Sequence, residues 1–362
     1  MSYKGWSVPP AAAMTSGSRR KQKMPTAKTI DTHAHILSDE TMRMIAKEAP
    51  AVAPKITPID DAFSVLEVAG VPYRPFPRGG WNLETRLKDM DAAEVDMQVL
   101  SNTPQTFLYT IDASLNATLA ALQNDQIAAT VKAHPDRFMG IATLPMQAPE
   151  LAAAELTRAM RTLGLKGAQI GSNVNGRNLD DPALEPLWEA ANALSAFIMI
   201  HPTQVAGSDR LKSYYLANLI GNPLDSTIAA ASLVFGGVIA RFPKIRFLFV
   251  HGGGFVPYQF GRWIHGWQVR SEPQVHLKES PEAALKTLWF DSILHAKEPL
   301  EYLVASAGVH RVVLGSDYPY DMGTLECVRQ VRALSIPDAD KDRILRGGPL
   351  ALAGAAEQRS AA

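Results

Sequence analysis

The sequence predicts a single (β/α)8 barrel, and three observations support this fold class. Eight short apolar runs alternate with helical patterns along the 362 residues, as in a barrel of parallel strands joined by helices. Several runs are almost continuously apolar, as expected for parallel strands buried on both faces. No obvious interdomain linker interrupts the alternation. The predicted organisation is a flexible N-terminal extension at 1–27, a catalytic barrel over 28–355 and a frayed C-terminal tail at 356–362.

The predicted strands are short segments dominated by aliphatic and aromatic residues. In chain order they are 29–36, 97–103, 138–144, 167–171, 196–201, 245–251, 288–293 and 312–317. Parallel strands need crossover connections, which are usually helices. The segments between these strands are therefore expected to carry the outer helices of the barrel.

Helical patterns fill most of the gaps between the strands. Segment 149–163 is amphipathic and ends at Gly164, a residue suited to a helix C-cap. Segment 181–194 begins with Asp-Pro, a combination typical of a helix start. The predicted helices are 83–94, 149–163, 181–194, 281–288 and 299–307. Two long segments, 38–81 and 203–222, are predicted as βα loops, which shape the substrate pocket of a barrel.

Charge and cysteine content bear on which partners the protein binds and on the redox state of its compartment. Lys and Arg together number 36, as do Asp and Glu, so net charge gives no support for binding nucleic acid or an anionic membrane. Cys327 is the single cysteine, so the chain can form no internal disulfide, and we expect a reducing cytoplasm. No apolar run approaches the roughly 20 residues of a membrane helix. Segment 1–27 lacks the apolar core of a secretory signal. It is expected to be a flexible tail or a misplaced start, and the alternative is a targeting or partner-binding arm.

Metal-binding residue types close four of the predicted strands. His33 and His35 lie two residues apart, so their side chains point to the same side of the strand. Three later strands end at His201, His251 and Asp317. In a barrel the carboxyl ends of all strands meet at one rim, so these five side chains should converge. Imidazole and carboxylate are suitable ligands for zinc and similar divalent ions.

This set divides into ligands and one remaining histidine. His33, His35, His201 and Asp317 are expected to bind one divalent ion, with zinc first and manganese or cobalt as alternatives. His251 is then left as a proton-transfer residue beside the bound water. The alternative is a group of core histidines bonded to backbone carbonyls. That alternative suits a single histidine better than a set at barrel strand ends.

Two further features of the sequence stay open. Gly252-Gly253-Gly254 after His251 indicates either a close approach of the backbone to a ligand or a tight turn. Asp31 and Asp291 lie in predicted strands and are candidates for orienting the metal ligands.

The motifs as a set resemble the amidohydrolase superfamily, and in particular its 2-amino-3-carboxymuconate-6-semialdehyde decarboxylase family. The resemblance extends from Thr29 to about Leu352. It rests on the segments Ile30-Asp31-Thr32-His33-Ala34-His35-Ile36, Leu144-Pro145-Met146-Gln147-Ala148-Pro149, Gln169-Ile170-Gly171, Val250-His251-Gly252-Gly253-Gly254 and Leu314-Gly315-Ser316-Asp317-Tyr318-Pro319.

The resemblance implies roles for individual residues. It implies a zinc site with the four ligands named above, and His251 and Asp317 as catalytic residues. It also implies that Arg74 holds a substrate carboxylate, with Arg78 as a rival for this role. Arg262 is implied to reach the pocket of a neighbouring subunit, so a homodimer is expected. The alternative for Arg262 is an ordinary surface charge.

The expected function is zinc-dependent, non-oxidative decarboxylation of a small unsaturated or aromatic carboxylic acid. The alternative is a metal-dependent hydrolase of the same superfamily that cleaves an ester, lactone, amide or carbon–carbon bond, since the metal chemistry is shared. A barrel without catalytic activity is a further alternative. One departure from the family matters, because Thr203 stands where the decarboxylase has tryptophan after the His-Pro of the fifth strand. The substrate is therefore less determined than the reaction.

Overall fold

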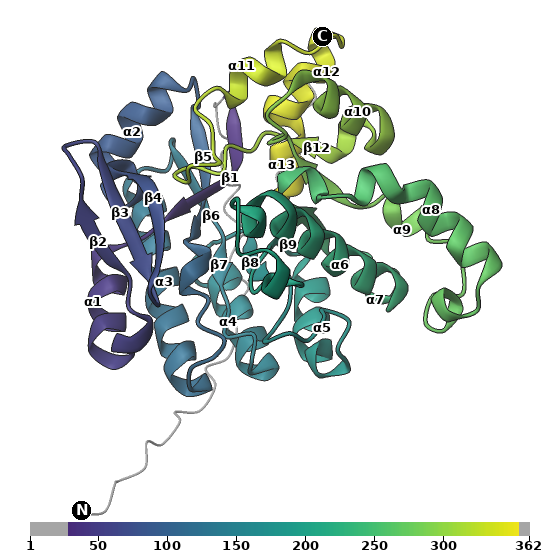
Figure 1. Cartoon of the computed structure of the whole chain (residues 1–362), viewed down its shortest axis with the longest axis horizontal. Helices are drawn as coiled ribbons and strands as arrows, with labels where there is room; N and C mark the ends of the chain where they lie inside the picture. The colour runs from purple at the N-terminus through teal and green to yellow at the C-terminus, as the bar shows by residue number, and fades with distance from the viewer. Residues whose placement is uncertain (1–27, 355–362) are drawn as a thin grey trace, which may run out of the picture.

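The computed structural model describes residues 28–354. The predicted N-terminal extension at 1–27 and the tail at 356–362 lie outside the described residues. Parallel strands occupy the centre of the molecule and helices surround them (Figure 1). Within residues 28–354, none of the helices is both long enough and apolar enough to cross a membrane.

All eight predicted strands form, one of them split in two. They are β1 (Ile30–Ile36), β5 (Met97–Asn102), β6 (Phe138–Gly140), β7 (Ala142–Thr143), β8 (Gly167–Gly171), β9 (Phe197–His201), β10 (Arg246–Phe249), β11 (Trp289–Asp291) and β12 (Val312–Val313). They pair in parallel in the orders β1-β5-β6 and β12-β11-β10-β9-β8-β7.

Backbone hydrogen bonds bring the two parallel sheets together at both ends. Ile141 N, between β6 and β7, donates to Leu100 O at 3.0 Å. On the other side Thr32 N donates to Leu314 O at 2.8 Å, and Ala34 forms a parallel bridge with Tyr318. The first and last strands are therefore neighbours, as in a barrel.

Long helices cover the outside of the strands. They are α2 (Leu83–Ala92), α3 (Ala113–Ala133), α4 (Pro149–Arg161), α5 (Glu185–Leu194), α6 (Asn222–Phe235), α8 (Val256–Val269) and α10 (Lys297–Ala307). The other helices are α1 (Asp39–Glu48), α7 (Val238–Arg241), α9 (Glu282–Leu285), α11 (Cys327–Arg332), α12 (Asp338–Asp342) and α13 (Gly348–Leu352). The predicted helices correspond to α2, α4, α5, α9 and α10. The sequence did not predict α3, because buried polar residues such as Asn116, Gln123 and Asn124 obscure its apolar face.

The core has two layers because successive strand residues point to opposite faces. Met199 and Leu248 belong to a cluster that also contains Leu350 of α13. Ile198 and Phe247, their neighbours in sequence, belong to the larger cluster that includes the surrounding helices. These layers fix the strands, and with them the side chains at their carboxyl ends.

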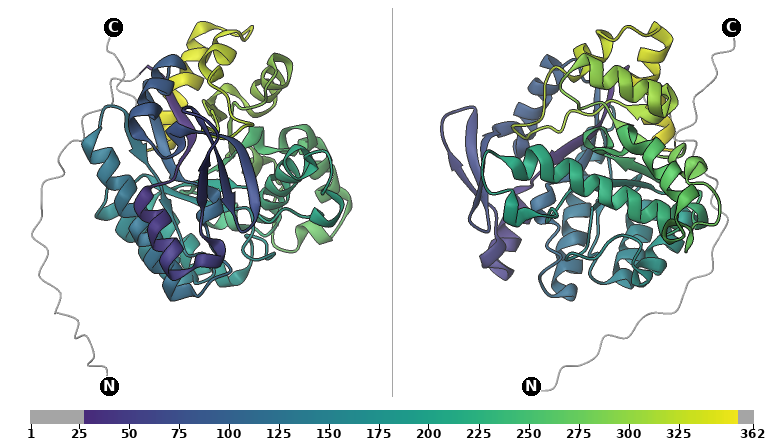
Figure 2. Two further views of the ribbon diagram at one scale, coloured as in Figure 1. Left: turned by 60° about the vertical axis from the view of Figure 1, so that its left-hand side comes forward. Right: turned by 45° about the vertical axis from the view of Figure 1, so that its right-hand side comes forward.

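Segment 38–81 is not the continuous loop that the sequence predicted. After α1 it forms an antiparallel sheet of β2 (Lys55–Pro58), β3 (Phe63–Val68) and β4 (Val71–Pro77). Figure 2 shows this sheet at the side of the barrel. Burial alternates along β3, as in a strand with one face covered. The prolines in β2 and β4 obscured the pattern, although proline is tolerated at sheet edges and bulges.

Candidate metal centre

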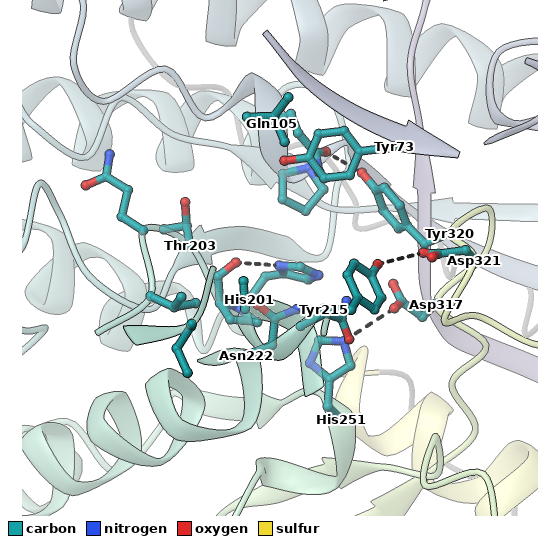
Figure 3. Close-up of a pocket in the computed structure, with 18 of the residues that line it drawn as sticks. Tyr73, Gln105, His201, Thr203, Tyr215, Asn222, His251, Asp317, Tyr320 and Asp321 are labelled. Atoms are coloured by element: carbon teal, nitrogen blue, oxygen red, sulfur yellow. Dashed lines mark hydrogen bonds and ion pairs between the residues drawn. The ribbon is translucent and has the colours of Figure 1, made fainter. Parts of the chain in front are cut away.

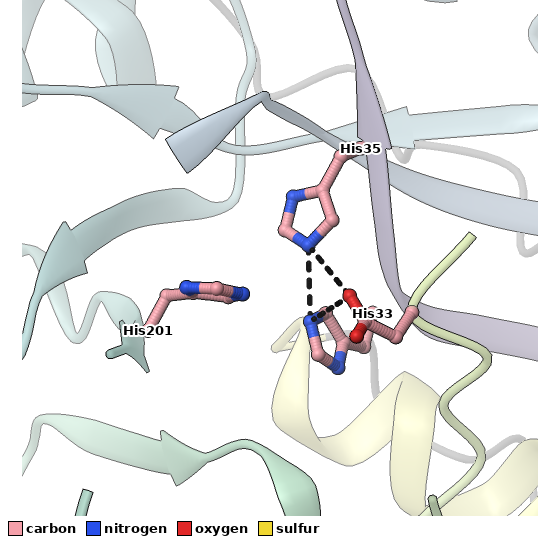
Figure 4. A group of neighbouring side chains, drawn as sticks. His33, His35 and His201 are labelled. Atoms are coloured by element: carbon pink, nitrogen blue, oxygen red, sulfur yellow. Dashed lines mark hydrogen bonds and ion pairs between the residues drawn. The ribbon is translucent and has the colours of Figure 1, made fainter. Parts of the chain in front are cut away.

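Three imidazoles and one carboxylate converge at the carboxyl ends of the strands. His33 and His35 lie in β1, His201 is the last residue of β9, and Asp317 follows β12. One potential ligand atom from each of the four lies within 4.8 Å of all the others, and all four side chains are buried. Figure 4 shows the three rings turned toward one another. The structure therefore brings together the four ligands predicted from the sequence.

Each imidazole is oriented by a partner at Nδ1. The partners are Asp291 Oδ2 for His33 at 2.7 Å, Ser101 Oγ for His35 at 3.0 Å and Pro202 O for His201 at 3.0 Å. The Ser101 hydroxyl donates to Ala34 O at 3.0 Å, so it is free to accept from His35. With Nδ1 donating in all three rings, the lone pairs lie on Nε2, as metal ligation requires.

The converging acceptors have no donor between them. His33 Nε2 lies 3.1 Å from His35 Nε2, and both atoms lie within 3.3 Å of Asp317 Oδ1. Among the described residues, His201 Nε2 and Asp317 Oδ1 are buried without a hydrogen-bond partner. Buried polar atoms are nearly always satisfied in proteins. A divalent cation would satisfy this donor set, so the residues fit a metal ion.

The protonation states agree with this interpretation. Burial lowers the pKa of His35 to about 4, and burial with the neighbouring rings holds the pKa of His201 well below its usual range. Burial opposes the charge on Asp317, but the histidines, His33 first among them, hold the pKa of that carboxyl well below its usual range. Neutral imidazoles and an ionised carboxylate are the forms that bind metals.

His33 responds differently because two carboxylates face it. Burial tends to lower its pKa, but Asp317 and then Asp291 outweigh burial, and the pKa of His33 is raised. The carboxylates that favour a proton on His33 also favour a cation at the same place. Because a metal binds the neutral imidazole, metal binding and protonation of His33 would compete.

His251 and Asp317 lie beyond the strands rather than at the predicted strand ends. Strand β10 stops at Phe249 and β12 stops at Val313. His251 and Asp317 adopt left-handed backbone angles, with φ of 57° and 53° respectively. Such angles are strained for residues other than glycine and often occur at functional sites. His251 Nε2 lies 3.4 Å from Asp317 Oδ2, so the turn places His251 beside the four ligands.

The glycines after His251 form a tight turn. Gly252, Gly253 and Gly254 all have positive φ. A Cβ atom on Gly254 would lie 2.0 Å from Pro223 O, so only glycine fits there. Gly252 N donates to Asp291 Oδ1 at 2.7 Å. Of the two alternatives left open by the sequence, the structure favours the turn.

A cavity of about 700 Å³ opens above the four ligands. His201, His251, Asp317 and Thr203 lie in its wall (Figure 3). Arg74 also lines the cavity. The predicted substrate arginine is thus at the cavity, whereas its rival Arg78 is not among the lining residues. The sequence did not single out other polar wall residues, which are Tyr73, Gln105, Gln204, Lys212, Tyr215, Asn218, Asn222, Tyr320 and Asp321.

Tyr320 is an aromatic wall residue that contacts one of the candidate ligands. Its ring packs edge-on against His35 with centroids 5.3 Å apart, and its hydroxyl donates to Gln105 Oε1. Tyr320 follows Asp317 by three residues. Its position directly after the segment Leu314–Pro319 was the one feature of the sequence that could have indicated a place at the site.

Arg262 is not brought to the cavity of its own chain. It lies on α8, is exposed to solvent and is absent from the cavity lining. Its predicted role in a neighbouring subunit stays a prediction.

A buried polar network supports β1 from behind. Asp31 accepts from Ser316 Oγ at 2.6 Å and from Gln98 Nε2 at 3.0 Å. Arg86, which is fully buried, donates to Gln98 Oε1 at 2.9 Å, and also to the carbonyls of Gly79 and His35. Asp31 was a candidate from the sequence, whereas Arg86 was missed.

Comparison with known proteins decides the family. The profile of the family described as Amidohydrolase matches residues 30–354. The chain belongs to this amidohydrolase family. The 2-amino-3-carboxymuconate-6-semialdehyde decarboxylase of Dictyostelium discoideum is 35% identical over 329 residues, which are 90% of this chain and 91% of the relative. The resemblance stated from the sequence is thereby confirmed.

Solved structures support the fold of this amidohydrolase. A 5-carboxyvanillate decarboxylase from Novosphingobium aromaticivorans, solved with manganese and 4-hydroxy-3-methoxy-5-nitrobenzoic acid, aligns with a TM-score of 0.77 and 23% identity, covering 90% of this chain and 96% of its own. A dihydroxybenzoic acid decarboxylase from Polaromonas sp., solved with manganese and the inhibitor 2-nitroresorcinol, aligns with a TM-score of 0.73 and 22% identity, over 90% and 96%. The predicted barrel class is confirmed.

Replacing Asp291 with alanine should weaken metal binding to this amidohydrolase by about 10- to 100-fold. The change removes the acceptor that holds His33 Nδ1 and the Gly252 amide. Competition with a chelator would measure the affinity. Asp338→Ala is the matched control, because its side chain is 94% exposed. Equal metal affinity in Asp291→Ala and the wild type would contradict the orienting role.

Proposed function

We propose that this amidohydrolase is a metal-dependent, non-oxidative decarboxylase of a small unsaturated or aromatic carboxylic acid. The observation that carries the proposal is the convergence of three Nε2 atoms and the Asp317 carboxylate on one point below the cavity. The similarity to the Dictyostelium decarboxylase supports the reaction class. We also propose that the described barrel is the catalytic domain.

Each residue of the site has a separate role in the proposed reaction. His33, His35, His201 and Asp317 would hold the ion, which would supply Lewis-acid chemistry to a substrate oxygen and to the negative charge that develops in decarboxylation. His251 transfers the proton to the substrate carbon that loses its carboxylate. Arg74 binds a substrate carboxylate through its guanidinium group.

Zinc is the ion that we propose. Three imidazole nitrogens and one carboxylate oxygen are a ligand set typical of zinc. The two neighbour structures were solved with manganese, so manganese is the main competitor. Elemental analysis of protein purified without added metal tests the assignment.

Carbon dioxide release tests the proposed reaction. Metal-loaded enzyme is assayed on a panel of muconate-semialdehyde and hydroxybenzoate acids, with His33→Ala as the inactive control. We expect release from at least one acid and none from the control. A metal-loaded enzyme that releases no carbon dioxide from any acid, but hydrolyses esters or lactones, would favour the hydrolase alternative.

We further propose a homodimer in which Arg262 completes the partner's cavity. Arg262 has no hydrogen bond or ion pair among residues 28–354. It lies on the same helix as Tyr258, whose side chain is 76% exposed. Large exposed aromatic residues are typical of protein interfaces.

Arg262→Ala should raise KM by about 10- to 100-fold, because a charge-assisted bond to the substrate is lost. Mixing Arg262→Ala with His33→Ala subunits tests whether Arg262 acts across the interface. Each mixed dimer would hold one complete site, so we expect activity at low substrate to recover to about a quarter of the wild-type value. A mixture as inactive as its parents would show that Arg262 serves no partner.

A further inference from the structure

A buried carboxylate lies behind the loop that follows His201. Asp225, in the first turn of α6, is only 4% exposed. Among the described residues, no lysine, arginine or histidine forms an ion pair with it. Its oxygens instead accept three hydrogen bonds, from Ser172 Oγ and Asn173 Nδ2 (3.0 Å) at Oδ2 and from Ala206 N (3.1 Å) at Oδ1. These donors belong to the loops after β8 and β9, so the carboxylate joins two neighbouring loops of the barrel rim.

The Ser172 hydroxyl links this carboxylate to the backbone after His201. The hydroxyl has one proton, which it donates to Asp225 Oδ2 rather than to the more distant Thr203 O at 3.5 Å. Its oxygen is then turned to accept from Thr203 N at 3.1 Å. Asn173 Nδ2 also donates to Thr203 O at 2.7 Å, so the peptide groups on both sides of Thr203 are held.

The peptide group between Pro202 and Thr203 connects this network to an imidazole. A peptide group is planar, so a fixed direction of its N–H also fixes the direction of its C=O. The N–H of this group is Thr203 N, and its C=O is Pro202 O, which accepts from His201 Nδ1 at 3.0 Å. Holding Thr203 N therefore holds the acceptor that orients the His201 ring and leaves the lone pair on Nε2.

We propose that Asp225 is a positioning residue of the metal centre, which orients His201 through the Ser172 hydroxyl and one peptide group. A carboxylate contacts the ring of His33 directly, whereas at His201 two groups intervene. Buried hydrogen-bond chains of this kind strengthen one another and specify a single arrangement. The inference goes beyond the proposed reaction and rests only on the assignment of His201 as a metal ligand in the proposed function.

Competition with a chelator measures the affinity for zinc independently of turnover. Asp225→Ala should lower the affinity of the full-length protein by about 10-fold, because Ser172 loses the acceptor that fixes its hydroxyl. Asp225→Asn should recover most of this loss, since its amide oxygen can take the place of Oδ2. Asp209→Ala is the matched control and should bind zinc like the wild type, because Asp209 is exposed in the same loop as Ala206 and lies outside the cavity lining.

A His201→Ala background separates orientation of this ring from a general loss of structure. With the imidazole absent, Asp225→Ala should change the zinc affinity by less than about 2-fold, because the two changes act on the same path. Ser172→Ala tests the same path while removing only a hydroxyl, and should also lower the affinity by about 10-fold. This variant decides the question if the Asp225→Ala protein does not fold.

The outcomes distinguish this inference from the proposed function. Zinc affinity equal to that of the wild type in Asp225→Ala or Ser172→Ala would overturn the positioning role. An equal loss from Asp225→Ala with and without His201 would also overturn it, because a general effect on the site would explain the loss. Both results would leave the proposed function standing. Failure of the wild type to bind any divalent ion would overturn the proposed function together with this inference.

Discussion

His251→Ala should lower kcat by about 100- to 10,000-fold while the protein keeps its metal, because the change removes a proton-transfer group and no ligand. His251 Nε2 lies 3.4 Å from Asp317 Oδ2, and its Nδ1 atom has no partner among the described residues. The imidazole thus lies at the edge of the candidate ligand set, with Nε2 beside Asp317 and Nδ1 buried. Steady-state kinetics and elemental analysis on the same preparation would measure both quantities.

His265→Ala is the matched control for this experiment. His265 is an exposed histidine on α8, outside the cavity, and its replacement should change neither kcat nor metal content. A His251→Ala enzyme with wild-type turnover would remove the proton-transfer role. Loss of metal from His251→Ala would instead place His251 among the ligands.

Arg86→Met should reduce the free energy of unfolding by about 3–5 kcal/mol, because it leaves buried acceptors unpaired. Methionine retains an unbranched stem but cannot donate to Gln98 Oε1 or to the carbonyls of Gly79 and His35. Since one of these carbonyls belongs to a ligand residue, metal affinity should fall as well. Denaturant unfolding of the metal-loaded protein measures the first effect and chelator competition the second.

Arg241→Met provides the comparison for Arg86→Met. Arg241 is 46% exposed and pairs with Glu185 at 3.1 Å on the surface. Exposed ion pairs contribute roughly 0–1 kcal/mol, so this variant should unfold close to the wild type. Similar losses in the two variants would show that burial of Arg86 has no special consequence.

The convergence of the four candidate ligands could be predicted from the sequence because each lies in, or closes, a recognisable strand pattern. Strand periodicity places His33 and His35 on one side, and barrel geometry brings His201 to the same rim. The same reasoning extended β10 and β12 too far, since it could not anticipate that His251 and Asp317 adopt left-handed angles after shorter strands.

Other parts of the site carry no periodic signal. Arg86 lies in a predicted helix like any polar residue, and only the folded chain shows that it is completely buried. Lys212 is one charge in a segment without a pattern. The sheet of β2, β3 and β4 alternates in burial, but its prolines weaken the strand signal. The positions of these residues in the fold depend on contacts between segments that are far apart in the sequence, and short sequence motifs do not reveal such contacts.

The hydrogen bonds between the first and last strands have a consequence for synthesis of the protein. Thr32 and Leu314 meet across a separation of 282 residues, and the ligands on β1 and Asp317 lie at the same junction. A nascent chain on the ribosome therefore carries three imidazoles long before it carries the carboxylate opposite them. The complete set of candidate ligands exists only after Asp317 has been made, so metal capture by the full set has to follow synthesis of the last strand of the barrel.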